Sequence, residues 1–388
     1  MNKGGTGIMR VTCAIFFLLF TIVYLYCYQA DILAVAQHVL SHGATHYNPV
    51  IGTFIITLVL WLIQFGIYKF TGLCRRGHAL TYVPSLLLLG IITDISRDIA
   101  PNNYIGNWLW IFPLLMIVYA GVVWIVRQLE PIELPATSLG FFSRMTWINM
   151  LQMTAMSLIV CAIGCNDEVF HYRMSIEHKI LEGKYADALQ TGSNEEKTDS
   201  SLTCLRIYAL AKEHQLGEAL FEYPLIGGSD AMIPNGKSVK MMMVPEVWFY
   251  KDLGVYFVDK MTPKVYLETL CKSRFATKMS ADYLLCAYLL DGDLDSFINT
   301  LPKYYNLNAH LPQSYREALV LYTHIHEHPR IAYHSSVMDA DYADYRKIYY
   351  GTKNPQMQYA LLKDSYGKTY WFYYYKLKLA PLSMVSKL

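Results

Sequence analysis

The first part of the chain contains long stretches without charged residues. No Asp, Glu, Lys or Arg occurs between Arg10 and Asp31. A helix rises about 1.5 Å per residue, so about 20 apolar residues cross the hydrocarbon core of a bilayer. The pattern predicts a polytopic helical membrane domain with about five spans, which cover residues 11–28, 50–68, 80–92, 108–126 and 147–163. The third of these is short and contains Pro84, so it either crosses with little tilt or enters the membrane only partly.

Charged residues are distributed unevenly along the chain. Of 33 basic and 31 acidic residues, only eight and five lie in residues 1–165, which leaves 25 and 26 in residues 166–388. This contrast predicts two domains in different solvents, a transmembrane domain (1–165) and a soluble domain (166–388). The soluble part has a formal charge of −1 and lacks the basic surface of nucleic-acid-binding proteins. The lipid bilayer is therefore an expected partner, and nucleic acid is not.

Basic residues in the short loops predict the orientation. With a cytoplasmic N-terminus, one Arg, Arg97, lies in the outside loops, and the inside segments contain Lys3, Arg10, Lys69, Arg75, Arg76, Arg127 and Arg144. An odd number of spans then places the C-terminal domain outside. The charge bias therefore predicts a multi-pass membrane protein whose C-terminal domain lies outside the cytoplasm, which in a bacterium is the periplasm. Four spans would reverse that placement.

Two segments of the membrane half resemble a known family. AQHVLSHGATHYNPVIG (36–52) and RRGHALTYVPSLLLLGIITDI (75–95) resemble an uncharacterised family of Bacteroidota membrane proteins, which joins N-terminal spans to a helical C-terminal region. The resemblance implies a bacterial inner-membrane location. It implies no activity and no catalytic residues.

Residues 166–388 are expected to be all-α, because apolar residues recur there at helical spacing. Several segments resemble tetratricopeptide repeats, which are helix pairs of about 34 residues. These segments are GKYADAL (183–189), QLGEAL (215–220), DGDLDSF (291–297) and the spacing of Tyr250, Leu253, Gly254 and Phe257. We expect a degenerate tetratricopeptide-like α-solenoid. Ala219 is expected in a helix–helix contact, and Lys212 on the exposed face.

Histidines provide the candidate metal ligands. His38 and His42 would share one face of a short interfacial helix, with His46 after it, and His324 and His328 would share a face of another helix. The alternatives are ordinary hydrogen bonds at the membrane surface and a solvated helix end. No nucleotide-binding, nucleophile-elbow or zinc-protease motif occurs, so no catalytic residue and no cofactor is predicted.

Two acidic clusters have competing interpretations. Asp94 and Asp98, beside Arg97, could serve a glycosyltransferase-like site or be solvated ends of spans. Asp291, Asp293 and Asp295 alternate like part of a calcium loop, but the glycine and closing glutamate of such a loop are missing, which favours helix capping.

The C-terminal tract TYWFYYYKLK (369–378) could stack on sugar rings, pack on a membrane surface or form the closing helix of the array. No CxxC occurs, and Cys204, Cys271 and Cys286 could form a disulfide if the domain faces an oxidising compartment. The expected function is a membrane-anchored module whose outer domain binds a protein or peptide. The alternative is a membrane enzyme or transporter for a lipid-linked or glycan substrate near the outer ends of the spans.

Overall fold

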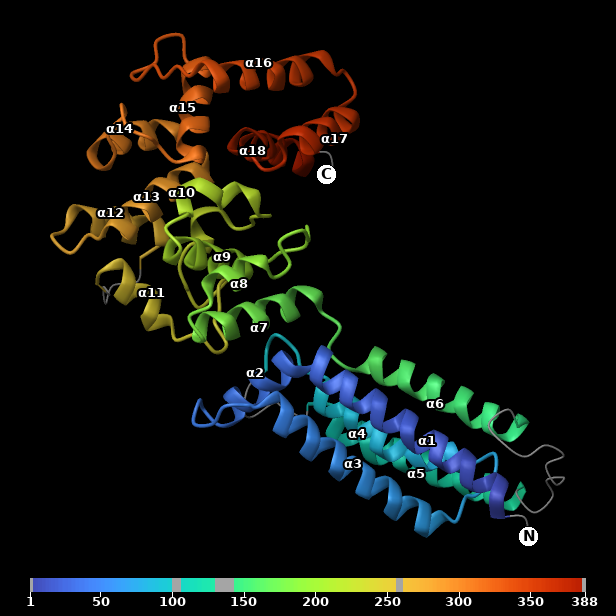
Figure 1. Cartoon of the computed structure of the whole chain (residues 1–388). Helices are drawn as coiled ribbons and strands as arrows, with labels where there is room; N and C mark the ends of the chain where they lie inside the picture. The colour runs from blue at the N-terminus through green and yellow to red at the C-terminus, as the bar shows by residue number, and fades with distance from the viewer. Residues whose placement is uncertain (1–2, 100–105, 130–142, 256–260, 386–388) are drawn as a thin grey trace. The chain divides into compact units, whose positions relative to one another are not determined.

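The computed structural model describes residues 3–99, 106–129, 143–255 and 261–385, and every regular element in these ranges is a helix (Figure 1). The all-α fold class expected from the sequence is therefore confirmed. The chain divides into two compact units, Met1–Met174 and Ser175–Leu388. Each unit is considered by itself below.

The N-terminal unit is a bundle of apolar helices. Its elements are α1 (Lys3–Val23), the π-helical turn η1 (Tyr24–Tyr28), α2 (Ala30–Leu40), α3 (Pro49–Thr71), the 3₁₀ turn η2 (His78–Tyr82), α4 (Val83–Thr93), α5 (Trp108–Leu129) and α6 (Arg144–Ile163). Four helices in the described ranges are long and apolar enough to cross a membrane: Gly7–Tyr28, Pro49–Thr71, Trp108–Leu129 and Arg144–Ile163. They contain four of the five predicted spans. The remaining one, 80–92, lies in the shorter apolar helix His78–Thr93.

Local signals fix the bounds of α3. The side chain of Asn48 accepts hydrogen bonds from the backbone N–H groups of Val50 and Ile51, and Pro49 occupies the first turn, where its missing N–H costs nothing. Gly72 ends the helix with φ +67°, a conformation that favours glycine. The helix between these caps has 23 residues, most of them apolar, which is sufficient for a complete crossing.

Asn149 joins three helices at one end of the bundle, which we call the Asn149 end. Its Oδ1 accepts a hydrogen bond from Ala79 N at 2.7 Å, and its Nδ2 donates to Arg75 O at 3.0 Å and to Met9 Sδ at 3.1 Å. The starts of α1, η2 and α6 therefore meet here. Val126 near the C-terminus of α5 is also at this end, since a Cβ placed on Gly77 would lie 2.7 Å from its Cγ1.

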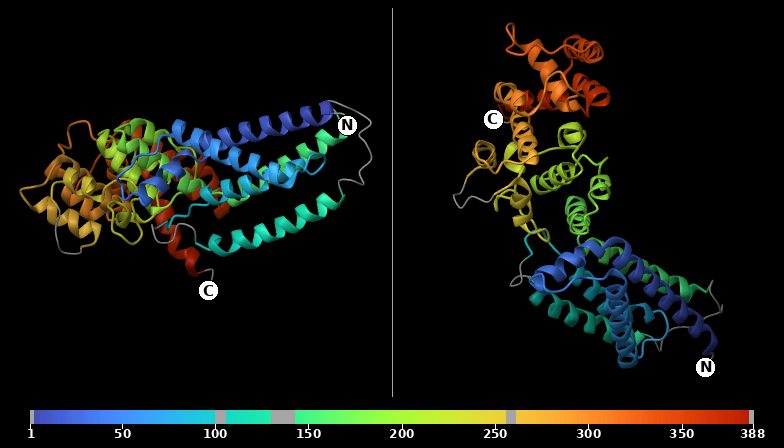
Figure 2. Two further views of the ribbon diagram at one scale, coloured as in Figure 1. Left: turned by 90° about the horizontal axis from the view of Figure 1, so that it is seen from below. Right: turned by 60° about the vertical axis from the view of Figure 1, so that its left-hand side comes forward.

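Thr93 lies in a second polar cluster at the opposite ends of the same helices, which we call the Thr93 end. Its Oγ1 is 3.2 Å from Tyr24 Oη, and its carbonyl oxygen accepts from Cys165 N at 2.9 Å. Trp108 Nε1 donates to Asp94 Oδ2 at 2.6 Å, which places the start of α5 here. Helix α5 itself is peripheral: none of its residues is buried, and the left view of Figure 2 shows it at the edge of the bundle.

Shorter helices follow the bundle. They are α7 (Glu168–Leu181), α8 (Tyr185–Gln190), α9 (Ser200–Lys212), α10 (Leu216–Ala219), η5 (Leu220–Glu222), η6 (Gly228–Ala231), α11 (Glu246–Leu253), α12 (Pro263–Lys272), α13 (Lys278–Asp291), α14 (Leu294–Tyr304), α15 (Gln313–Ile325), α16 (Ser336–Gly351), α17 (Pro355–Tyr366) and α18 (Tyr370–Val385).

Each repeat-like segment lies at a turn or at the start or end of a helix. Gly183 (φ +74°) precedes α8, Gly292 (φ +71°) precedes α14, and Gly254 ends α11. Phe257, part of the expected spacing, lies outside the described residues. Ala219 is half-buried against the core, as expected. The expected exposure of Lys212 was wrong: its side chain is 26% exposed, because Nζ pairs with Asp252 at 2.5 Å.

Four aromatic residues of the tract 369–378 belong to the core, while its two lysines are exposed. The tract forms the start of α18, where Tyr370, Trp371, Phe372 and Tyr375 are buried. The Tyr345 hydroxyl donates to the carbonyl oxygen of Trp371, and the Trp371 ring lies 5.0 Å from that of Tyr342. Aromatic packing of this kind joins α16, α17 and α18, because the Tyr366 ring of α17 also lies against the rings of Tyr345 and Trp371.

Candidate functional site

A polar pocket lies among the last four helices of the C-terminal unit, which Figure 1 shows in orange and red. Its volume is about 410 Å³, within the range typical of ligand sites. We call it the Glu317 pocket. Its walls are Gln313, Arg316 and Glu317 of α15, Met338 and Asp341 of α16, Ser365 and Tyr366 of α17, Thr369, and Trp371 of α18.

Glu317 fixes the wall of this pocket. Its side chain is buried, its Oε1 accepts from Gln313 Nε2 at 2.9 Å, and its Oε2 accepts from Tyr370 N at 2.6 Å. The carbonyl oxygen of Glu317 also accepts from Trp371 Nε1 at 2.8 Å. Three hydrogen bonds thus involve this one residue, two of which join α15 to the first turn of α18. Both carboxyl oxygens of Glu317 accept hydrogen bonds from the protein, so this residue holds α15 and α18 together. For the same reason it is poorly placed to transfer a proton to a ligand.

Burial raises the pKa of Glu317 to about 7, because the ionised carboxylate is poorly solvated. Hydrogen bonds from Gln313 and from the backbone of Tyr370 oppose that shift, as does the positive charge of Arg316. Near neutral pH a large fraction of Glu317 is therefore uncharged, so it does not fully neutralise the neighbouring arginine.

Arg316 is the cation of the pocket. Among the residues that the structure describes, its guanidinium has no hydrogen bond or ion pair, and its Nε is buried without an acceptor. A guanidinium offers several donors in a planar fork that matches a carboxylate. With the side-chain amide of Gln313 and the hydroxyl of Ser365 on the same walls, the pocket can hold an anionic group beside the indole of Trp371.

The first group of histidines is not brought together by α2. His38 is in its last turn, but the helix ends at Leu40, and His42 follows with φ +52°. The expected common helical face of His38 and His42 is therefore wrong. His42 and His46 are exposed. In the described ranges no group of three His, Cys, Asp or Glu residues is placed to hold a metal ion.

The second pair is separated for a similar reason. Helix α15 ends at Ile325, so His328 lies beyond it and the expected common face with His324 is also wrong. The ring of His324 stacks on Tyr342 at 4.9 Å, and its Nε2 is 3.8 Å from Asp339 Oδ1. His328 is exposed.

The acidic clusters have local structural partners. Asp94 accepts from Trp108, and Arg97 forms an ion pair with Asp167 at 2.5 Å. In the second cluster, Asp293 caps α14 by accepting from Ser296 N at 3.1 Å, as the capping interpretation predicts. Lys264 Nζ lies 3.1 Å from Asp293 and 3.4 Å from Asp291, so an ammonium group occupies the position where a cation would be expected.

The three cysteines of the C-terminal unit are free. Cys204 and Cys286 are buried, and Cys271 is half-buried. Each thiol has a local partner: Cys204 contacts Met232 O at 3.6 Å, Cys271 contacts Ser280 O at 3.5 Å, and Cys286 contacts the Tyr315 hydroxyl at 3.6 Å. None of the three pairs with another cysteine in this structure.

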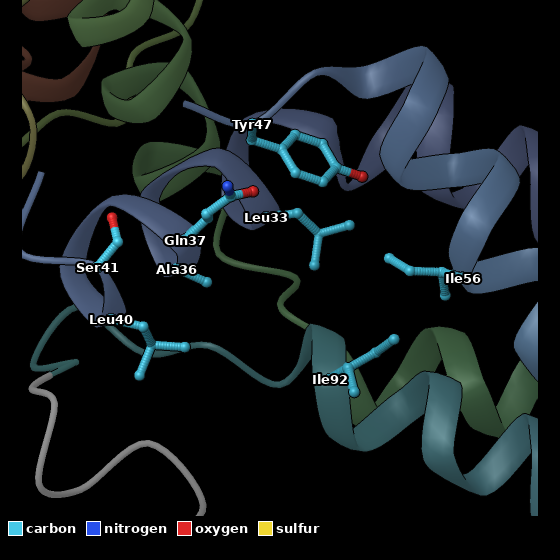
Figure 3. Close-up of a pocket in the computed structure, with 8 residues that line it drawn as sticks. All are labelled: Leu33, Ala36, Gln37, Leu40, Ser41, Tyr47, Ile56 and Ile92. Atoms are coloured by element: carbon cyan, nitrogen blue, oxygen red, sulfur yellow. The ribbon is translucent and has the colours of Figure 1, made fainter. Parts of the chain in front are cut away.

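A second pocket, of about 430 Å³, lies beside α2 in the N-terminal unit. We call it the α2 pocket. Figure 3 shows Leu33, Ile56 and Ile92 projecting from α2, α3 and α4 toward a common space, with Gln37 and Tyr47 on the side away from Ile92. Ala36, Leu40 and Ser41 complete its lining.

Sequence reasoning missed both pockets. For the first, a signal was present: Glu317 sits in the run SYREALVLY (314–322), where helical spacing puts position 317 on the buried face with Ser314, Ala318 and Leu321. An acid on such a face requires a partner. Arg316 gave no signal, because its lack of a partner depends on how α16 and α17 fold back.

Comparison with known proteins gives a family match for part of the chain. The model of a family of unknown function (DUF6057) matches residues 250–377. The matched segment contains every residue that lines the Glu317 pocket. No curated protein and no solved structure matches the chain significantly.

Proposed function

We propose that the chain is a multi-pass inner-membrane protein whose C-terminal domain, outside the cytoplasm, binds an acidic peptide segment of a partner protein in the Glu317 pocket. The observation that carries the proposal is the guanidinium of Arg316, which has no hydrogen bond or ion pair in the part of the chain that the structure describes and lies on the wall of a polar pocket of about 410 Å³. An arginine whose charge is only partly neutralised, here by Glu317, gains from a ligand that supplies a carboxylate.

Five crossings are part of this proposal. The start of η2 contacts the Asn149 end and Thr93 belongs to the other end, so the segment His78–Thr93 connects the two. Five residues of 3₁₀-helix and eleven of α-helix rise about 27 Å, close to the hydrocarbon thickness of about 30 Å. These contacts support α1, α4 and α6 running in one direction and α3 and α5 in the other.

Charge supports the same topology. The basic residues counted as cytoplasmic flank the helix termini at the Asn149 end, whereas Arg97 follows α4 beyond the Thr93 end. The positive-inside rule then places the Asn149 end in the cytoplasm. Cys165, where the bundle leads into the C-terminal unit, is at the Thr93 end. This supports an outer, periplasmic position for residues 166–388 in a bacterial cell.

The helix pairs of the C-terminal unit support a degenerate tetratricopeptide-like solenoid. Gly183 and Gly292 form left-handed turns between consecutive helices, and α10 packs closely on α15: a Cβ on Gly217 would lie 2.7 Å from the Tyr315 ring. Stacked helix pairs create surfaces suited to extended peptides. The Bacteroidota family that residues 36–52 and 75–95 resemble remains part of the proposal.

The alternative, an enzyme or transporter for a lipid-linked or glycan substrate at the Thr93 end, has less support. Of the groups that could act there, Asp94 accepts from Trp108 and Arg97 pairs with Asp167. Both are therefore committed to structural contacts.

A library of peptides ending in free carboxylates or carrying Asp and Glu, screened against the 166–388 domain, tests the proposed function. We expect acidic peptides to be selected, with affinity that falls as salt rises. Arg316→Gln should abolish their binding. The matched control is Arg346→Gln, because Arg346 is exposed on α16, over the Tyr350 ring and outside the pocket. Selection of neutral peptides, or equal losses in both variants, would refute the proposed site.

A further inference from the structure

We propose that the α2 pocket holds one acyl chain of a bilayer phospholipid, with the polar end of the lipid at Gln37, Ser41 and Tyr47. The site is separate from the Glu317 pocket and does not depend on which side of the membrane the C-terminal domain occupies. It requires only that the N-terminal bundle lies in a bilayer.

The lining has two chemically distinct parts. Leu33, Ala36 and Leu40 from α2, Ile56 from α3 and Ile92 from α4 are aliphatic, whereas Gln37, Ser41 and Tyr47 carry polar groups. In Figure 3, Gln37 and Tyr47 lie on the side away from Ile92. A cavity that is aliphatic on one side and polar on the other fits an amphiphile better than a sugar or an ion.

The depth of the pocket matches this assignment. Ile56 is seven residues into α3, so it lies about 10 Å below the start of that helix. The polar layer of one leaflet is only roughly 5–8 Å thick. Ile56 therefore reaches the hydrocarbon, while Tyr47 and Ser41 belong to segments outside α3 and remain near the interface.

The pocket is continuous with the surface that faces lipid. Ile56 belongs to α3, and its neighbours Phe54 and Ile55 are 69% and 52% exposed, followed by Leu58 and Val59 on the same helix. In a bilayer those side chains contact acyl chains. A chain lying along α3 can therefore enter beside Ile56 without crossing a polar barrier, which commits the site to a membrane lipid and not to a soluble ligand.

Photolabelling of the full-chain protein tests the site. The protein is placed in vesicles of phosphatidylethanolamine and phosphatidylglycerol that contain a trace of phospholipid with a photoactivatable group in one acyl chain, and labelled peptides are mapped by mass spectrometry. We expect labelling per exposed residue to be higher on α2 and the first turns of α3 than on α5. A group near the chain end should label Ile56 and Ile92, and one near the headgroup Gln37 and Tyr47.

Pocket-filling variants sharpen the test. Ala36→Trp occupies the cavity, and excluding even two methylenes should lower labelling there about tenfold. Leu40→Trp is the second variant, because Leu40 is 43% exposed and tolerates a larger ring. Val118→Trp on α5, where the side chain is 56% exposed, is the control and should leave labelling of α2 unchanged. Uniform labelling of all exposed apolar helices, or undiminished α2 labelling in both pocket variants, would overturn the proposal.

Discussion

The carboxylate of Glu177 accepts a hydrogen bond from the backbone N–H of Met243 at 2.6 Å, and the neighbouring N–H groups of Met242 and Val244 donate to the same side chain. Glu177 is completely buried. One acid of α7 thus satisfies three consecutive donors in the segment before α11. These hydrogen bonds hold residues 242–244 in one conformation, although this segment has no regular secondary structure.

Replacing Glu177 should destabilise the C-terminal domain strongly. Glu177→Ala leaves three donors unpaired, two of them buried and one part-buried, and we expect a loss of about 3 kcal/mol or more in the free energy of unfolding. Urea unfolding of the 166–388 domain, followed by circular dichroism, measures it. Glu195→Ala is the control, because Glu195 is exposed and should change stability by less than about 0.5 kcal/mol. Equal losses of stability in the two variants would show that the hydrogen bonds of Glu177 do not stabilise the domain.

Glu317 should make stability depend on pH in a defined window. The pKa of its carboxyl is about 7 in the folded protein, whereas the ordinary value for Glu, which applies to the unfolded chain, is 4.5. As pH rises from about 4.5 to about 7, the unfolded chain releases this proton first, so the folded state loses stability. Gln does not titrate, so the Glu317→Gln variant does not lose this stability. As pH rises from about 4.5 to about 7, its free energy of unfolding should increase relative to that of the original domain by on the order of 3 kcal/mol. Denaturant unfolding at pH 4.5, 6 and 8 tests it, and parallel curves for the two proteins would contradict it.

The contact between α10 and α15 should not tolerate a methyl group. A Cβ on Gly217 would lie 2.7 Å from Tyr315 Cζ and 3.0 Å from Pro312 Cβ. We expect Gly217→Ala to cost about 1–3 kcal/mol. Gly351→Ala is the matched control, since nothing lies within 4 Å of its added Cβ. Urea unfolding followed by circular dichroism measures both variants. An unchanged free energy of unfolding in Gly217→Ala would show that α10 and α15 can move apart without loss of stability.

Alkaline phosphatase fusions in a bacterial host test the proposed topology. Fusions after Cys165 and after Asp98 should be active, and fusions after Arg75 and Arg127 inactive. The Asp98 fusion examines α4 directly, because a segment that enters the membrane and returns would leave Asp98 on the cytoplasmic side. If both the Asp98 and Cys165 fusions are inactive, the chain crosses the membrane four times and its C-terminal domain lies in the cytoplasm.

The long apolar helices were predictable because hydrocarbon imposes a length and forbids charge, and both are visible in a single sequence. The histidine pairs were not, because their expected faces required α2 and α15 to continue, and helix ends depend on local capping. Lys212 illustrates a related limit. Its helical position suggested exposure, but Asp252, 40 residues later, folds beside it. Arg316 was invisible for the same reason, because a missing partner is a property of the tertiary structure.

The sealed thiols of Cys204 and Cys286 make the C-terminal domain its own reporter of opening. Both side chains are completely buried, and neither is joined to another cysteine. A thiol reagent can modify them only during excursions in which α9 or α13 leaves the core. The rate at which these two thiols are modified, followed by mapping their peptides apart from those of the more accessible Cys27 and Cys271, therefore reports those excursions in intact membranes as well as in purified protein.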